Sequence, residues 1–180
     1  MTWKKQKIFI TFNHFQWNKV TNPARLVFAA NQQMKDSKKS LNQHLMQGPN
    51  HLQELVKILL RFRVYPVIFN MDVSKFFLRT LVAKEDNDYL RFFLIKRGEN
   101  GQIKLEHARC LGYPWGLCSS PFVCCFLMKI HAQKYLQDPE LQEASKQIIL
   151  NSYVDDVLIG HVDEEKLLDL AKKAKKILQE

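Results

Sequence analysis

The sequence lacks several features that would assign it to a simple class. No apolar run approaches the roughly 18 residues that a membrane-spanning helix needs. The first residues, MTWKKQKIFITF, have neither the long apolar segment nor the small-residue cleavage site of a secretory signal. The four cysteines form no CxxC pair, so neither a zinc site nor a disulfide framework is indicated. We therefore expect an intracellular, cytoplasmic protein whose cysteines are reduced and mostly buried.

Acidic residues are scarce relative to basic ones. The chain has 27 Lys and Arg against 18 Asp and Glu, a net charge of +9. This balance favours a polyanionic partner, with nucleic acid ahead of a membrane because no amphipathic basic helix dominates.

Repeats and low-complexity tracts are also absent, and 46% of the 180 residues are hydrophobic. We expect one globular domain, with or without a small appendage.

Hydrophobic patterning predicts alternating strands and helices. Strands are expected at 8–12, 24–30, 64–73, on both sides of the turn 97–101, and at 148–150 and 157–160 around NSYVDD. Helices are expected at 51–62, after Ser119 or Ser120 as N-cap with Pro121 in the first helical position, and from about Asp163 onward. This order predicts an α+β fold, with an antiparallel sheet backed by helices on one face.

Two of these helices carry predictions about burial. In the helix at 51–62, Leu52, Leu55, Val56, Leu59 and Phe62 follow helical spacing and predict one buried face. The helix that begins near Ser120 is almost wholly apolar, so we expect it to be buried on most sides.

Three aspartates are the candidate chemistry of the chain. NSYVDDVLIG places Asp155 and Asp156 side by side between apolar runs, and Asp72 ends the apolar strand VIFNMD. Adjacent carboxylates repel each other, so they either lie on an exposed turn in water or are held by a cation. Three aspartates that converge from neighbouring strands would form an oxygen-only site suited to Mg²⁺ or Mn²⁺. Two such ions can activate an attacking hydroxyl and neutralise a leaving pyrophosphate.

The surrounding motifs resemble a reverse transcriptase. FNMDVSKFF, LGYPWGLCSSP and YVDD, in this order, are similar to motifs A, B and C of that family. The surrounding sequence resembles the polymerase of the BEL/Pao group of LTR retrotransposons in six blocks: ARLVFAA, SLNQHLMQGPNHL, LLRFRVYPV, EDNDYLRFFL, PWGLCSSPF and YVDD. The resemblance runs from about residue 10 to the end of the chain. It implies an RNA-directed DNA polymerase with the fingers and palm of a right-hand fold.

The resemblance also implies a domain division and a metal site. Residues 1–66 would be part of the fingers, and residues 67–180 the palm, with a fingers-derived insertion around 78–108. Asp72, Asp155 and Asp156 would be the catalytic metal ligands, and the backbone carbonyl of Val73 a further ligand. The implied cofactor is Mg²⁺ or Mn²⁺. The implied partners are a primed RNA or DNA template and a dNTP, with no membrane.

Four further residues match positions near the nucleotide in that family. Phe77 would be the aromatic gate that excludes a ribose 2′-OH, or else a residue of the core. Arg25 would clamp the triphosphate through its planar guanidinium, or else lie on the surface. Trp115 and Gly116 would lie against the nucleotide, or else form an ordinary turn. For Ser120 and Pro121, helix capping is the better explanation than substrate contact.

Several positions depart from the family pattern. Ala29 stands where an aspartate is usual and Asn18 where a lysine is usual, while the neighbouring Lys19 would face the other way on a strand. Phe76 replaces a small residue beside the triphosphate path. Thumb and RNase H segments do not follow the YVDD motif here, so we expect them in a parent polyprotein. The resemblance implies that the chain itself is found in the cytoplasm, in a retrotransposon particle or in the nucleus.

Three hypotheses follow from the sequence. The leading one is two-metal transfer of a dNTP onto a primer 3′-OH. The second is a decayed or co-opted remnant that binds nucleic acid without catalysis. The third is a metal-binding or structural α+β domain in which YVDD is only a turn.

Overall fold

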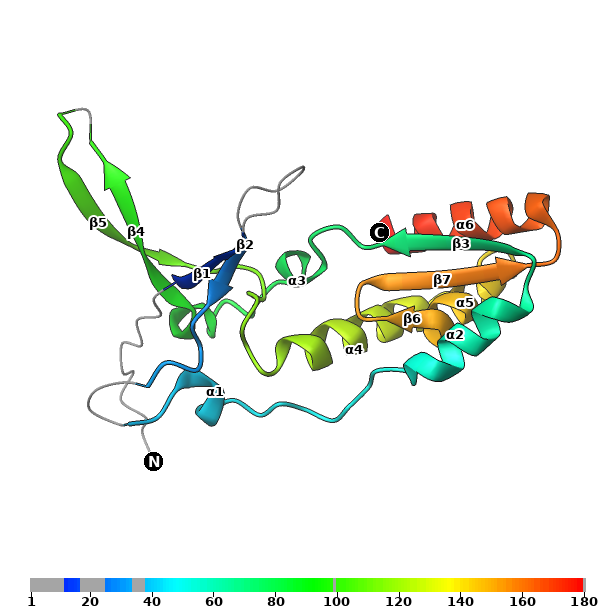
Figure 1. The fold of residues 1–180 in the computed structure, drawn as a ribbon, viewed down its shortest axis with the longest axis horizontal. Helices are drawn as coiled ribbons and strands as arrows, with labels where there is room; N and C mark the ends of the chain where they lie inside the picture. Colours follow the sequence, from blue (N-terminus) through cyan, green and yellow to red (C-terminus); the bar gives the residue numbers. More distant parts are fainter. Residues whose placement is uncertain (1–11, 17–24, 34–37, 99, 180) are drawn as a thin grey trace. The chain divides into compact units, whose positions relative to one another are not determined.

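The computed structural model describes residues 12–16, 25–33, 38–98 and 100–179, with the backbone alone at 12–16, 25 and 26. The chain divides into two compact units, whose elements are labelled in Figure 1. Unit 1 comprises residues 1–47 and 77–120, and unit 2 comprises residues 48–76 and 121–180. Both combine helices with antiparallel strands, so the predicted α+β class is confirmed.

Unit 1 contains two separate two-stranded antiparallel sheets. Strand β1 (Phe12–Gln16) pairs with β2 (Arg25–Phe28), and β4 (Arg91–Arg97) pairs with β5 (Ile103–Arg109). Its helical elements are short: α1 (Leu41–His44), the 3₁₀ helix η1 (Asn87–Tyr89), and α3 (Phe76–Arg79), which begins at the boundary with unit 2. The strands predicted at 24–30 and around 97–101 are therefore confirmed. The one predicted at 8–12 falls almost entirely outside the described residues.

Unit 2 is built on a three-stranded antiparallel sheet in the order β3-β7-β6. The strands are β3 (Val67–Asp72), β7 (Asp156–His161) and β6 (Ser152–Tyr153). Its helices are α2 (Leu55–Val64), α4 (Ser120–Gln133), α5 (Gln142–Asn151) and α6 (Glu164–Gln179). The predicted strand at 64–73 and the predicted helices near Ser120 and Asp163 are confirmed. No helix in the described part of the chain is both long and apolar enough to cross a membrane.

The core of unit 2 lies on one face of this sheet. Val157 and Ile159 of β7 pack with Met71 of β3, with Ile148 of α5, and with apolar residues of α4 and α6. Side chains alternate between the two faces along a strand, so Asp72 and Asp156 lie on the second face. On that face the Tyr65 ring, which follows α2, lies over Gly160. The second face is therefore partly covered from the α2 side.

Three local predictions were wrong. Residues 148–150 belong to helix α5, because Ile148 is needed in the helical layer of the core. The buried face of α2 centres on Ile58, whereas Val56 is 68% exposed and Leu55 and Leu59 are also exposed. Helix α4 is not buried on most sides. Three of its large apolar residues are exposed: Phe126, Leu127 and Ile130.

Candidate active site

Strand register brings two of the three predicted carboxylates together. Asp72, the last residue of β3, is the direct cross-strand partner of Asp156, the first residue of β7. Directly opposed residues of an antiparallel pair have Cβ atoms about 4.5–5.5 Å apart and point to the same face. Two ionised carboxylates at that spacing destabilise the pair unless a cation or a hydrogen-bond donor compensates them. The Asp72 side chain is exposed, and that of Asp156 is half-buried.

The third aspartate lies in the tight turn between β6 and β7. Tyr153 pairs with Asp156, so Val154 and Asp155 form a two-residue hairpin loop. Val154 has a φ of +55°, a conformation that a β-branched residue adopts only at a cost of about 1–3 kcal/mol. The Asp155 carbonyl accepts a hydrogen bond from the Val73 N–H at 2.9 Å, which ties the turn to the end of β3. The hairpin predicted around YVDD therefore forms, but its first strand is Ser152–Tyr153 and not residues 148–150.

A cysteine of α4 lies against this turn. Burial raises the pKa of the Cys125 thiol, a hydrogen bond with the Val154 backbone opposes that shift, and the negative charge of Asp155 adds to it. The cysteines as a group were expected to be mostly buried. Cys125 is half-buried, and its electrostatic environment includes one of the candidate metal ligands.

The donor chemistry at this end of the sheet fits Mg²⁺ or Mn²⁺, which prefer carboxylate oxygens. The strand register also fits, because it sets Asp72 opposite Asp156 and Asp155 next to it. The side chains as they stand do not complete a ligand set. Within the described residues, no group of three or more His, Cys, Asp or Glu side chains is placed to hold a metal ion.

Val73, the predicted backbone ligand, follows Asp72 directly. Its side chain is partly buried and packs against the core of unit 2. Its carbonyl accepts a hydrogen bond from the Phe76 N–H at 3.1 Å. A carbonyl oxygen has two lone pairs, so this bond leaves one acceptor position for another ligand.

Phe77 and Trp115, two of the predicted nucleotide-binding residues, pack on each other in unit 1. Their ring centroids are 4.2 Å apart and their planes are tilted by 50°. Phe77 is only 3% exposed, as a residue of the core would be. The Trp115 carbonyl accepts a hydrogen bond from the Phe28 N–H at 2.7 Å, which fixes the motif to the end of β2. The predicted contacts of both residues with a nucleotide stay predictions.

Gly116 has a local structural reason to be glycine. Its φ is +107°, and a Cβ at this position would overlap the Phe28 carbonyl oxygen. Its own carbonyl accepts a hydrogen bond from the Asn42 side chain at 2.9 Å. The same Asn42 accepts a hydrogen bond from the Cys118 N–H, also at 2.9 Å. The chain therefore requires glycine here for its own packing, whether or not a ligand approaches.

The remaining predicted residues lie in less informative places. The backbone of Arg25 is in β2, and its side chain lies outside the described residues, as do Asn18 and Lys19. Helix α4 begins at Ser120, one residue before Pro121, but the Ser120 hydroxyl donates to the Pro114 carbonyl at 3.0 Å. Ser120 thus links the PWG turn to the helix start.

Sequence reasoning missed three residues that shape these segments. Asn42 holds the turn at Gly116, Cys125 lies against the YVDD turn, and Arg61 of α2 reaches the end of α5. None of the three carries a local signal in the sequence. Arg61 lies three residues after the buried Ile58 of α2, but packing, and not the sequence pattern, decides which side of that helix faces inward.

Three aspartates at one end of an antiparallel sheet offer the carboxylates that a two-metal site for phosphoryl-transfer chemistry needs. A family model described as reverse transcriptase (RNA-dependent DNA polymerase) matches residues 14–180. The chain belongs to the reverse transcriptase family. No curated protein matches the chain at a significant level. Members of the family are nucleotidyltransferases that act on a nucleic acid template and dNTPs, in general with divalent metals.

Proposed function

We propose that this chain performs RNA-directed DNA synthesis, in which a primer 3′-OH attacks the α-phosphate of a dNTP and pyrophosphate leaves. The observation that carries the proposal is the pairing of Asp72 with Asp156, with Asp155 in the adjoining turn. Divalent ions held by these carboxylates would lower the pKa of the hydroxyl and neutralise the developing phosphate charge. In this proposal Asp72, Asp155 and Asp156 would hold the ions, and the Val73 carbonyl would be a further ligand.

The proposed assignment extends to the two units. Unit 2, with the aspartates, corresponds to the palm in this proposal, and unit 1 contains the fingers residue Arg25 together with Phe77, Trp115 and Gly116, which the resemblance assigned to the palm. The six sequence blocks support a BEL/Pao-type element as the origin of the chain. Segment 48–66, which the resemblance assigned to the fingers, belongs to the same compact unit as β3 and β7. In this assignment helix α2 therefore belongs to the palm.

A second candidate is binding of nucleic acid without catalysis. Two observations favour it. Among the described residues, the side chains form no three-ligand group for a metal. Ala29 and Phe76 also depart from the family pattern. The positive net charge would suffice for such binding. Steep salt dependence of template binding without any nucleotide incorporation would favour this candidate.

The experiment is primer extension on an RNA template with Mg²⁺ or Mn²⁺, comparing the wild-type chain with Asp155→Asn. The substitution keeps the side-chain shape and removes the charge that the cation requires. We expect incorporation to fall by at least about 100-fold, in line with the loss of a group that stabilises transition-state charge.

The matched control is Asp169→Asn on α6. Asp169 is exposed and pairs only locally, with Lys173 at 2.6 Å, so this variant carries the same charge change within unit 2. We expect it to incorporate dNTPs as the wild type does. Equal incorporation by wild type and Asp155→Asn would refute the proposal.

A further inference from the structure

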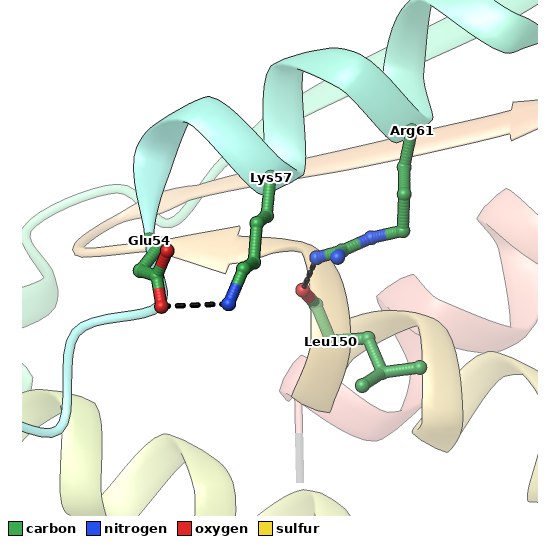
Figure 2. Close-up of polar contacts among 4 residues, drawn as sticks. All are labelled: Glu54, Lys57, Arg61 and Leu150. Carbon is green, nitrogen blue, oxygen red and sulfur yellow. Dashed lines mark hydrogen bonds and ion pairs between the residues drawn. The ribbon is translucent and has the colours of Figure 1, made fainter.

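Arg61 connects helix α2 to the end of helix α5. Its Nε donates to the Asn151 side-chain oxygen at 2.8 Å, and its Nη2 donates to the Leu150 carbonyl at 2.5 Å. Figure 2 shows the second of these bonds, with the guanidinium reaching from α2 down to the last turn of α5. Both acceptors lie directly before the YVDD hairpin.

The acceptors are groups that need a partner. The Leu150 carbonyl belongs to the last turn of α5, where carbonyls lack an intrahelical donor and the helix dipole favours a cation. Asn151 is only 8% exposed, and its amide nitrogen donates to Gln147 Oε1 at 2.7 Å. Since Arg61 occupies the amide oxygen and Gln147 the amide nitrogen, the Asn151 side chain is held at both ends. The last turn of α5 is thereby held to α2.

The distance along the chain from this junction to the candidate metal ligands is short. Strand β6 has only two residues, Ser152 and Tyr153, so the turn begins three residues after Asn151. On the other side, the turn is held by the Val73 N–H bond to the Asp155 carbonyl. The hairpin therefore has one anchor at the end of β3 and one at its base.

We propose that Arg61 is a positioning residue for Asp155 and Asp156: by fixing the α5–β6 junction it keeps both carboxylates in register with Asp72. Its effect on catalysis rests on the proposed function, whereas its effect on the hairpin does not. A planar guanidinium makes both bonds at once, which a lysine ammonium on a flexible stem does not reproduce. Partners outside the ligand shell that orient metal ligands typically change metal affinity or activity by about 10- to 100-fold.

The test compares Arg61→Gln, Arg61→Lys and the control Lys57→Gln in the full chain. Lys57 lies on the same helix one turn earlier, and its ion pair with Glu54 at 2.7 Å is exposed (Figure 2). We expect Arg61→Gln to raise the Mg²⁺ concentration for half-maximal primer extension about 10-fold. Arg61→Lys should lie between Arg61→Gln and wild type, and Lys57→Gln should match wild type.

A second measurement does not depend on activity. Hydrogen exchange at the amides of residues 152–157 should be faster in Arg61→Gln than in wild type, and unchanged in Lys57→Gln. Asn151→Ala should quicken exchange less in the Arg61→Gln background than in the wild-type chain, because the two substitutions remove one bond in common.

The outcomes separate the two proposals. If Asp155→Asn abolishes incorporation but folded Arg61→Gln keeps the wild-type Mg²⁺ dependence and exchange, the positioning role is wrong and the proposed function stands. If the wild-type chain incorporates no dNTP, the proposed function is wrong. Exchange at residues 152–157 then still decides: faster exchange in Arg61→Gln supports the hold on the hairpin, and unchanged exchange overturns it.

Discussion

The two units position their candidate site residues by different means. In unit 2, strand pairing sets Asp72 opposite Asp156, and one of the two side chains is exposed. In unit 1, side-chain packing positions Phe77 and Trp115, whose rings contact each other. The comparison shows that backbone register can bring charged groups together while their side chains stay available to a ligand. Packed aromatic residues have a structural reason to be present even when no ligand is considered.

The largest expected effect is a loss of stability in unit 2, where the strand pair that carries the aspartates rests on a buried core. Ile148 is fully buried beneath the β3–β7 pair, so Ile148→Ala should lower the free energy of unfolding by about 2–5 kcal/mol. Denaturant unfolding measures the change. Leu168→Ala on the exposed side of α6, where the residue is 48% exposed, should change stability by no more than about 0.5 kcal/mol. Equal losses in both variants would contradict the description of this core.

A smaller effect is expected in unit 1. Gly116→Ala forces a Cβ against the Phe28 carbonyl and a non-glycine residue into a φ of +107°, which should cost about 1–3 kcal/mol. Gly101→Ala is the matched control, since its φ is +72° but the space around it is open. Hydrogen exchange should show lost protection in the Phe28 and Trp115 segments for Gly116→Ala. Full protection there would contradict the close approach.

The smallest expected effect is a change in the reactivity of the Cys125 thiol, which lies beside the YVDD turn. Because burial and the Asp155 charge raise the pKa of Cys125, little of its thiol is ionised at neutral pH, and its alkylation should quicken as pH rises toward that pKa. Asp155→Asn removes one cause, so the pKa should fall and alkylation at pH 8 should quicken. The rise in rate should be modest, because the Asp155 charge is the smallest of the influences on this pKa. Mass spectrometry of the Cys125 peptide measures the rate, and Asp169→Asn should leave it unchanged.

The sequence predicted most strands and helices because their patterns were strong. VIFNMD formed a strand, and EEKLLDLAKKAKKILQ formed a helix with one buried apolar face, which includes Leu167, Ala171 and Ala174. Residues 148–150 failed because a three-residue apolar run fits a strand and a buried helix equally well. The segment is helical because its Ile148 side chain packs in the core together with residues of α4, α6 and β7.

The candidate site was less predictable than the fold. Motif spacing predicted the three aspartates and the hairpin, yet it could not predict that Arg61 bonds to residues about ninety positions later in the chain. It also could not give the rotation of α2, because apolar residues occupy more than one side of that helix and only packing selects Ile58 as the inward residue. Tertiary contacts of this kind have no local sequence signal.

The pairing of Asp72 with Asp156 restricts which insertions and deletions this chain can tolerate. One residue inserted within β3 would reverse the parity of the strand, so that Asp72 would turn toward Val157 and the apolar layer. Two inserted residues would restore the face but displace the carboxylate by roughly 7 Å along β7. Segment 67–72 is therefore a stretch in which length is constrained as strictly as residue identity.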